Sequence, residues 1–143
     1  MTYADSSFLV SLFIEDKNSR AAKDYLVTNP DPVSITTFSR SEALHAIRTL
    51  AFKKNIDLGE MTRALLQFEH DAAEGYLLLA ELESKTVFEK ADQLSNRHAA
   101  EVGVRYLDML HVASALLIGA RLFLTFDARQ AKLANAVGLQ VKP

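Results

Sequence analysis

The sequence is most informative at residues 106–127, which read YLDMLHVASALLIGARLFLTFD. Tyr106–Leu117 is apolar on nearly every side, interrupted only by Asp108, His111 and Ser114. This pattern predicts a helix that packs against several neighbours, and Gly119 is of the type that commonly ends a helix. Leu122–Leu124 then predicts a short buried strand. A buried helix followed at once by a buried strand is typical of an α/β fold.

The rest of the chain repeats this alternation of strands and helices. Further strands are expected at Thr2–Ala4, Val33–Thr36, Tyr76–Ala80 and Leu139–Val141, and further helices at Ser7–Glu15, Ser19–Thr28, Arg40–Lys53, Leu58–Ala73, Lys85–Glu101 and Asp127–Val137. The run Tyr76–Ala80 is also compatible with a buried helix, because periodicity alone does not separate the two in so short a segment. Strands separated by helices predict a mostly parallel sheet with helices on both faces.

Length and composition narrow the class of protein. We expect residues 1–143 to form a single domain, since 143 residues suffice for one core. The sequence has no cysteine, which excludes disulfides and thiolate metal sites. No apolar run approaches the roughly 20 residues of a membrane span. We therefore expect a cytoplasmic protein without membrane association.

The net charge of -2 does not favour nucleic-acid binding through a bulk positive field. A nucleic-acid-binding protein of this composition would need a local basic patch or a bound metal ion. Two basic clusters are present, one made of Arg40, Arg48, Lys53 and Lys54 and the other of Arg97, His98 and Arg105. We interpret both as solvated helix faces, which is the usual setting of such clusters.

Four acidic residues stand where a strand or loop gives way to a helix: Asp5, Glu42, Asp108 and Asp127. Asp5 and Asp127 follow strands that would end at the same edge of a parallel sheet, and Glu42 and Asp108 lie early in helices. Carboxylates brought together there would repel one another unless a cation held them ionised. Oxygen ligands without cysteine favour Mg²⁺ or Mn²⁺.

Each acid also has a purely structural interpretation. Asp5 and Asp127 are suitable N-caps, and Ser39 with Glu42 fits a capping box. Asp108 would lie in the first turn of its helix, where the helix dipole favours an acid. Burial there demands a partner, for which Arg105 and a metal ion are both candidates.

The sequence around these acids resembles the PIN-domain nucleases, in particular the VapC-type toxins. The resemblance extends over nearly the whole chain and is carried by Ala4-Asp5-Ser6-Ser7, Ser41-Glu42-Ala43, Tyr106-Leu107-Asp108-Met109-Leu110-His111-Val112-Ala113, and Leu124-Thr125-Phe126-Asp127 with Gly138-Leu139. The last two are the specific ones. The first strand departs from the family pattern, because Thr2-Tyr3-Ala4 is less bulky and apolar than usual.

The resemblance implies a three-layer α/β/α domain whose acids bind Mg²⁺ or Mn²⁺ and hydrolyse RNA phosphodiester bonds. Asp5, Glu42, Asp108 and Asp127 match the family's catalytic and metal-binding positions. Supporting positions match as well: Ser7 and Thr125 resemble its small hydroxyl residues, and Arg105 resembles a basic residue near the third acid. The resemblance also implies a homodimer and an antitoxin partner.

Two other functions remain open from the residues alone. One is a non-catalytic protein-binding module whose acids serve as caps. The other is a metal-dependent phosphatase, although no Asp-x-Asp pair follows the first strand to support a covalent route. The apolar stripe of Met61, Leu65, Leu66 and Phe68 could line a binding groove, but core packing is the favoured interpretation. His111, like the other histidines, is interpreted as a packed or hydrogen-bonded structural residue.

Overall fold

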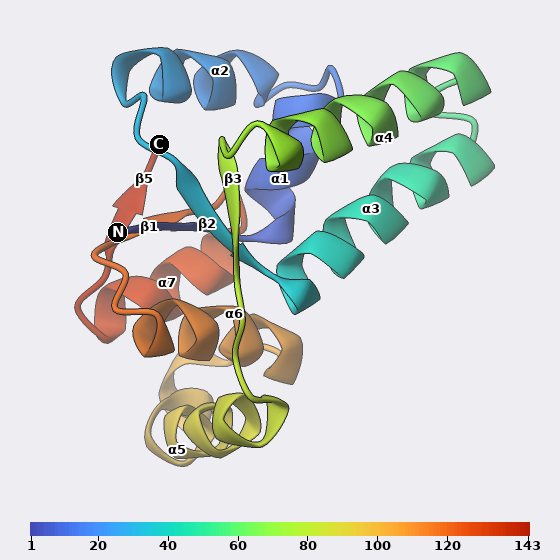
Figure 1. The fold of residues 1–143 in the computed structure, drawn as a ribbon. Coiled ribbons are helices and arrows are strands. Elements are labelled where there is room, and N and C mark those ends of the chain that lie inside the picture. The colour runs from blue at the N-terminus through green and yellow to red at the C-terminus, as the bar shows by residue number, and fades with distance from the viewer.

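The five strands form one sheet in which every neighbouring pair is parallel, in the order β3-β2-β1-β4-β5. The computed structural model describes all residues 1–143 and is drawn in Figure 1. The strands are β1 (Thr2–Ala4), β2 (Val33–Thr36), β3 (Leu77–Ala80), β4 (Leu122–Leu124) and β5 (Gln140–Lys142). The helices are α1 (Ser6–Phe13), α2 (Ser19–Thr28), α3 (Thr37–Phe52), α4 (Leu58–Ala73), α5 (Ser84–Val102), α6 (Tyr106–Leu117) and α7 (Ala128–Ala136).

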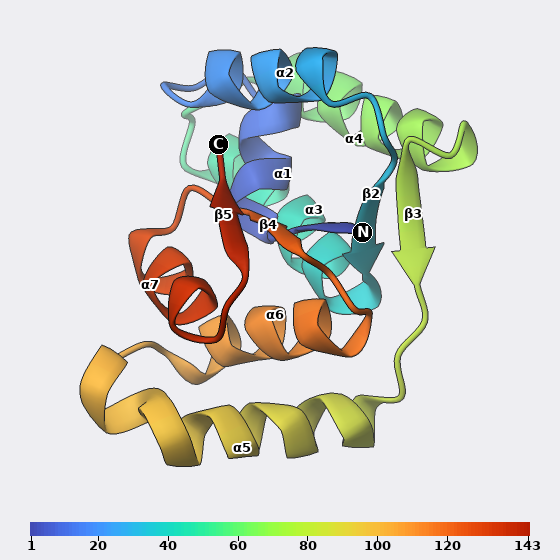
Figure 2. The same ribbon diagram turned by 90° about the vertical axis from the view of Figure 1, so that its left-hand side faces the viewer.

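Helices cover both faces of this sheet. Figures 1 and 2 show α1 to α4 on one side and α5 to α7 on the other. Successive strand residues point to opposite faces: Tyr3 and Phe123 join the core cluster under α5, α6 and α7, whereas Ala4 and Leu124 join the cluster under α1 to α4. The predicted three-layer α/β/α architecture is therefore confirmed, and the sheet is wholly parallel.

The helix α6 is the most deeply buried of the helices. Every residue from Asp108 to Ala115 is buried, as its nearly continuous apolar character predicts. Gly119 follows the helix with a φ of 71°, a left-handed conformation that favours glycine. The chain can then turn directly into β4, which lies beside β1 at the centre of the sheet.

The start of α3 differs from the prediction. The helix begins at Thr37, and Thr36 with Ser39 forms its capping box. The predicted capping box of Ser39 with Glu42 is therefore wrong, because Ser39 already lies inside the first turn. Glu42 is released from any capping role and is free to contact other elements.

The antiparallel pair α3 and α4 projects from the body of the molecule as an arm (Figure 1). On α4, Phe68 is buried and Met61 and Leu65 are half-buried, in agreement with the core interpretation. For Leu66 that interpretation is wrong, because 67% of this residue is exposed. None of the seven helices combines the length and apolar character that a membrane-spanning segment requires.

Candidate functional site

Asp5 is the most completely buried of the four predicted acids, with 0% exposure. It caps α1, because its Oδ1 accepts a hydrogen bond of 2.9 Å from the backbone N–H of Phe8. The Ser7 hydroxyl donates to the same carboxylate at 2.8 Å, and the Thr125 hydroxyl donates to its Oδ2. Burial raises the pKa of Asp5, against the lowering effects of His111 and these hydrogen bonds. The site thus holds a desolvated, firmly oriented carboxyl group.

The same two hydroxyls connect Asp5 to the loop that carries Asp127. The Ser7 Oγ accepts from the backbone N–H of Phe126 at 2.9 Å, and the Thr125 Oγ1 accepts from that of Asp127 at 2.9 Å. Asp127 in turn caps α7 by accepting from the backbone N–H of Arg129. These bonds fix the carboxyl ends of β1 and β4 to each other, and both N-cap predictions are confirmed.

Glu42 reaches the same edge of the sheet from the second turn of α3. Its Oε2 accepts a hydrogen bond from the Ser6 hydroxyl and lies 2.7 Å from the Nε2 of His111. The hydrogen bond from His111 is the main reason that the pKa of Glu42 is lowered. Since an ionised carboxylate only accepts, this Nε2 carries the hydrogen. Glu42 is therefore held in its charged form.

His111 is also bonded on its other side. Its Nδ1 lies 2.9 Å from the hydroxyl of Tyr3, and both residues are fully buried. The Tyr3 ring packs at 5.5 Å from that of Phe123. Tyr3 therefore fills the core beside Phe123 and positions His111. The interpretation of His111 as a hydrogen-bonded core residue is confirmed.

Asp108 is 6% exposed and has a partner that was not predicted. Its Oδ1 accepts a 3.2 Å hydrogen bond from the side-chain amide of Gln130, and its Oδ2 accepts from the backbone N–H of Arg105. The guanidinium of Arg105 is exposed and forms no ion pair with Asp108. Arg105 is therefore a partner of Asp108 through its backbone N–H and not through its guanidinium, and buried Gln130 supplies the side-chain hydrogen bond.

Gln130 links two of the acids. Its backbone N–H donates to Asp127 Oδ1 at 3.2 Å, while its side chain donates to Asp108. Its own Oε1 is buried without a hydrogen-bond partner. Its place in the first turn of α7, three residues after Asp127, is the only signal in the sequence that could have identified it.

The chemistry of this edge fits a hard divalent cation. The available donors are carboxylate, hydroxyl and amide oxygens, which Mg²⁺ and Mn²⁺ prefer, and the Gln130 Oε1 is an unsatisfied oxygen among them. In their present rotamers the side chains do not form a ready-made cluster of three or more ligands. A shallow hollow of about 350 Å³ borders Ser6, Ser7 and Asp127, which is the only one of the four acids in its lining.

Sequence comparison assigns the class of domain. The model of the PIN domain family matches residues 2–136, and the chain therefore belongs to the PIN-domain family. No curated protein matches the chain.

Solved structures show the same fold. VapC20 of Mycobacterium tuberculosis, a toxin that cleaves the sarcin–ricin loop, has a TM-score of 0.72 at 16% identity, over 100% of both chains. A toxin–antitoxin complex from Klebsiella pneumoniae has a TM-score of 0.61 at 18% identity, over 91% of this chain and 89% of that one. FitAcB from Neisseria gonorrhoeae has a TM-score of 0.62 at 15% identity, over 100% and 97%. The architecture is thus that of VapC-type PIN domains.

Proposed function

We propose that this protein is a metal-dependent endoribonuclease and the toxin of a toxin–antitoxin pair. The observation that carries the proposal is the buried Asp5, whose carboxyl group is oriented by two hydroxyls at the carboxyl edge of a PIN-domain sheet. A carboxyl group whose pKa is raised by burial is destabilised when ionised, and a bound cation would compensate that cost. The similarity in fold to toxin ribonucleases supports RNA as the substrate.

In this proposal Asp5, Asp108, Asp127 and Glu42 would hold Mg²⁺ or Mn²⁺. The ion would neutralise charge on the phosphate oxygens and lower the pKa of water at the site. Ser7 and Thr125 keep the Asp5 oxygens pointing to the edge, and His111 keeps Glu42 ionised. The half-buried Asp127 is accessible enough to accept a proton from an attacking water. Exposed Arg105 would contact the RNA backbone.

Association belongs to the same proposal. One of the structural neighbours is a toxin–antitoxin complex, which supports an antitoxin partner for this chain. We also propose a homodimer, which the resemblance to VapC-type toxins implies, and a cytoplasmic location, as expected of a protein with this composition.

The test is metal-dependent cleavage of single-stranded RNA by the wild type and by Asp5→Asn and Asp108→Asn. Both variants should lose cleavage and Mn²⁺ affinity by calorimetry while keeping the fold, because asparagine preserves size and can still cap a helix. Asp24→Asn, at an exposed position on α2, is the matched control. Cleavage unchanged in either site variant would overturn the assignment.

A non-catalytic binding module is the second candidate, and one observation favours it. Asp5 and Asp127 already satisfy helix N-termini, and Glu42 and Asp108 already have partners. If caps were their whole role, Mn²⁺ affinity would not depend on Asp5 or Asp108. The same calorimetric titration therefore separates the two functions.

A further inference from the structure

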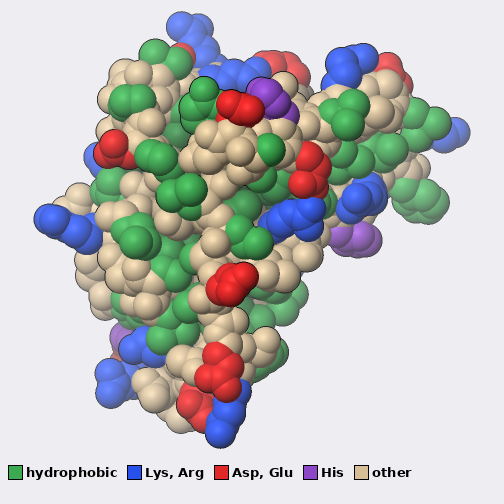
Figure 3. Space-filling view, in the orientation of Figure 1, with side chains coloured by type: hydrophobic (Ala, Val, Ile, Leu, Met, Phe, Trp, Pro, Cys, Tyr) green, Lys and Arg blue, Asp and Glu red, His purple; other side chains and the backbone are tan.

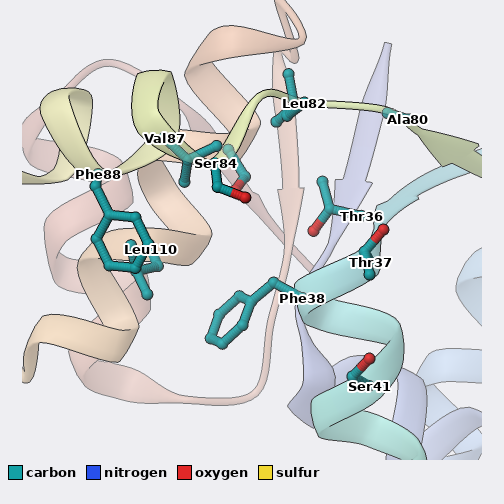
Figure 4. Close-up of a pocket in the computed structure, with 11 residues that line it drawn as sticks. Thr36, Thr37, Phe38, Ser41, Ala80, Leu82, Ser84, Val87, Phe88 and Leu110 are labelled. Carbon is teal, nitrogen blue, oxygen red and sulfur yellow. The ribbon is translucent and has the colours of Figure 1, made fainter.

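A neutral pocket lies next to the acidic edge. It encloses about 370 Å³ at the carboxyl ends of β2 and β3, between the first turns of α3 and α5, and Leu110 of α6 forms part of its wall. Figure 4 shows the ring of Phe88 overlapping Leu110 in this view, the ring of Phe38 across from them, and Ser84 at the start of α5 above. The two aromatic rings therefore come from different elements and border the same cavity.

The lining combines aromatic and hydroxyl groups without any charge. Thr37, Ser41 and Ser84 contribute exposed hydroxyls, and none of the eleven lining residues is Asp, Glu, Lys, Arg or His. A phosphate or carboxylate would find no cation there, and a lysine or arginine side chain would find no acid. A purely apolar side chain would leave the hydroxyls unused. The lining best fits a flat neutral ring with polar edges.

The pocket is connected to the proposed catalytic edge by direct contacts. Ser41 precedes Glu42 in the chain, and the ring of Phe38 packs 4.6 Å from that of His111. The Nε2 of His111 in turn bonds Glu42 at 2.7 Å. Two side chains, Phe38 and His111, would therefore link a ring bound in the pocket to Glu42.

We propose that this pocket binds one unstacked nucleobase of a single-stranded RNA, adjacent to the bond that is cut. Single-stranded bases are recognised by stacking on aromatic side chains and by hydrogen bonds to their edges. Phe88 supplies the accessible stacking surface, since it is 50% exposed, and the hydroxyls contact the edge of the base. The inference rests on the proposed ribonuclease function, and it names the part of the substrate that the site reads.

The first test is RNA binding without cleavage. A short fluorescein-labelled single-stranded RNA of mixed sequence is titrated with protein in EDTA, and anisotropy gives Kd. Phe88→Ala should raise Kd about tenfold, in line with the loss of one stacked base, whereas Phe88→Trp should restore binding. Tyr76→Ala is the control, because Tyr76 is an exposed aromatic residue at the opposite end of β3. Equal Kd values for wild type and Phe88→Ala, or no RNA binding by the wild type, would overturn the proposal that this pocket binds a base.

The second test locates the base. The same RNA is synthesised with an abasic ribose at one position at a time, and Kd is measured for wild type and Phe88→Ala. One position should weaken binding by the wild type and have no further effect on Phe88→Ala. If the abasic substitution and Phe88→Ala weaken RNA binding additively at every position, the assignment is refuted. Because no metal is present, failure of this inference is distinguishable from failure of metal-dependent cleavage.

Discussion

At the scale of single residues, Asp5 is costly to the fold. Burial raises its pKa, so the folded state binds its proton more tightly than the unfolded chain does. Such a group contributes stability that is present below the unfolded pKa and is lost as pH rises through the folded pKa. Above the ordinary carboxyl pKa of 3.8, Asp5 is therefore a source of instability that a neutral isostere would remove.

We predict that Asp5→Asn melts above the wild type at neutral pH in EDTA. The gain should be roughly 3 °C for a domain of this size, because the asparagine oxygen still caps α1 while the buried ionisable group is gone. The difference should shrink as pH falls toward the ordinary carboxyl value of 3.8. Thermal unfolding across pH measures it, with exposed Asp24→Asn as a control that shows no such trend. A less stable Asp5→Asn at neutral pH would refute the prediction.

At the scale of elements, the sequence predicts which segments form helices and strands but not the residue at which each one begins. Ser39 with Glu42 and Thr36 with Ser39 have the same spacing, and both fit a capped helix start. Which of the two pairs forms the capping box depends on where β2 ends. The end of β2 is set by its pairing with β3 and β1 rather than by local residues. The acids at helix starts were predictable, because caps and strand ends have local signatures. The Gln130–Asp108 and Tyr3–His111 contacts were not, because they join residues distant in the chain.

The first turn of α7 is expected to control the geometry of Asp108. Gln130→Met conserves volume but removes the amide that bonds Asp108. Loss of such an outer partner typically lowers metal affinity or activity by about 10- to 100-fold. We predict a loss in this range for Mn²⁺ affinity by calorimetry, with the folded structure intact by circular dichroism. Gln67→Met on the exposed face of α4 should leave the Mn²⁺ affinity at the wild-type value. An unchanged affinity in Gln130→Met would show that Gln130 does not control the geometry of Asp108.

At the scale of the whole molecule, charged side chains are spread over the surface, whereas several large exposed apolar side chains lie on the arm formed by α3 and α4. Side chains of both signs are interspersed on the face in Figure 3, consistent with the small net charge of -2. The exposed positions of Arg48, Lys53 and Lys54 agree with a solvated helix surface, and Arg40 pairs with Glu69. Large apolar side chains remain exposed on the arm, notably Phe52 at 87%, Leu58 at 71% and Leu66 at 67%. Contiguous apolar patches on a protein surface commonly mark interaction sites.

We predict that the wild type self-associates through the tip of the arm. Phe52 and Leu58 border the same hollow there, and burying them in a symmetric contact would remove both from water. Sedimentation should give twice the monomer mass, and the melting temperature should rise with protein concentration because association stabilises the folded state. Phe52→Glu should yield a folded monomer whose melting temperature is independent of concentration. The control variant Val27→Glu, at an exposed position on α2 away from the arm, should still dimerise. A wild type that stays monomeric at all concentrations would refute the proposed interface.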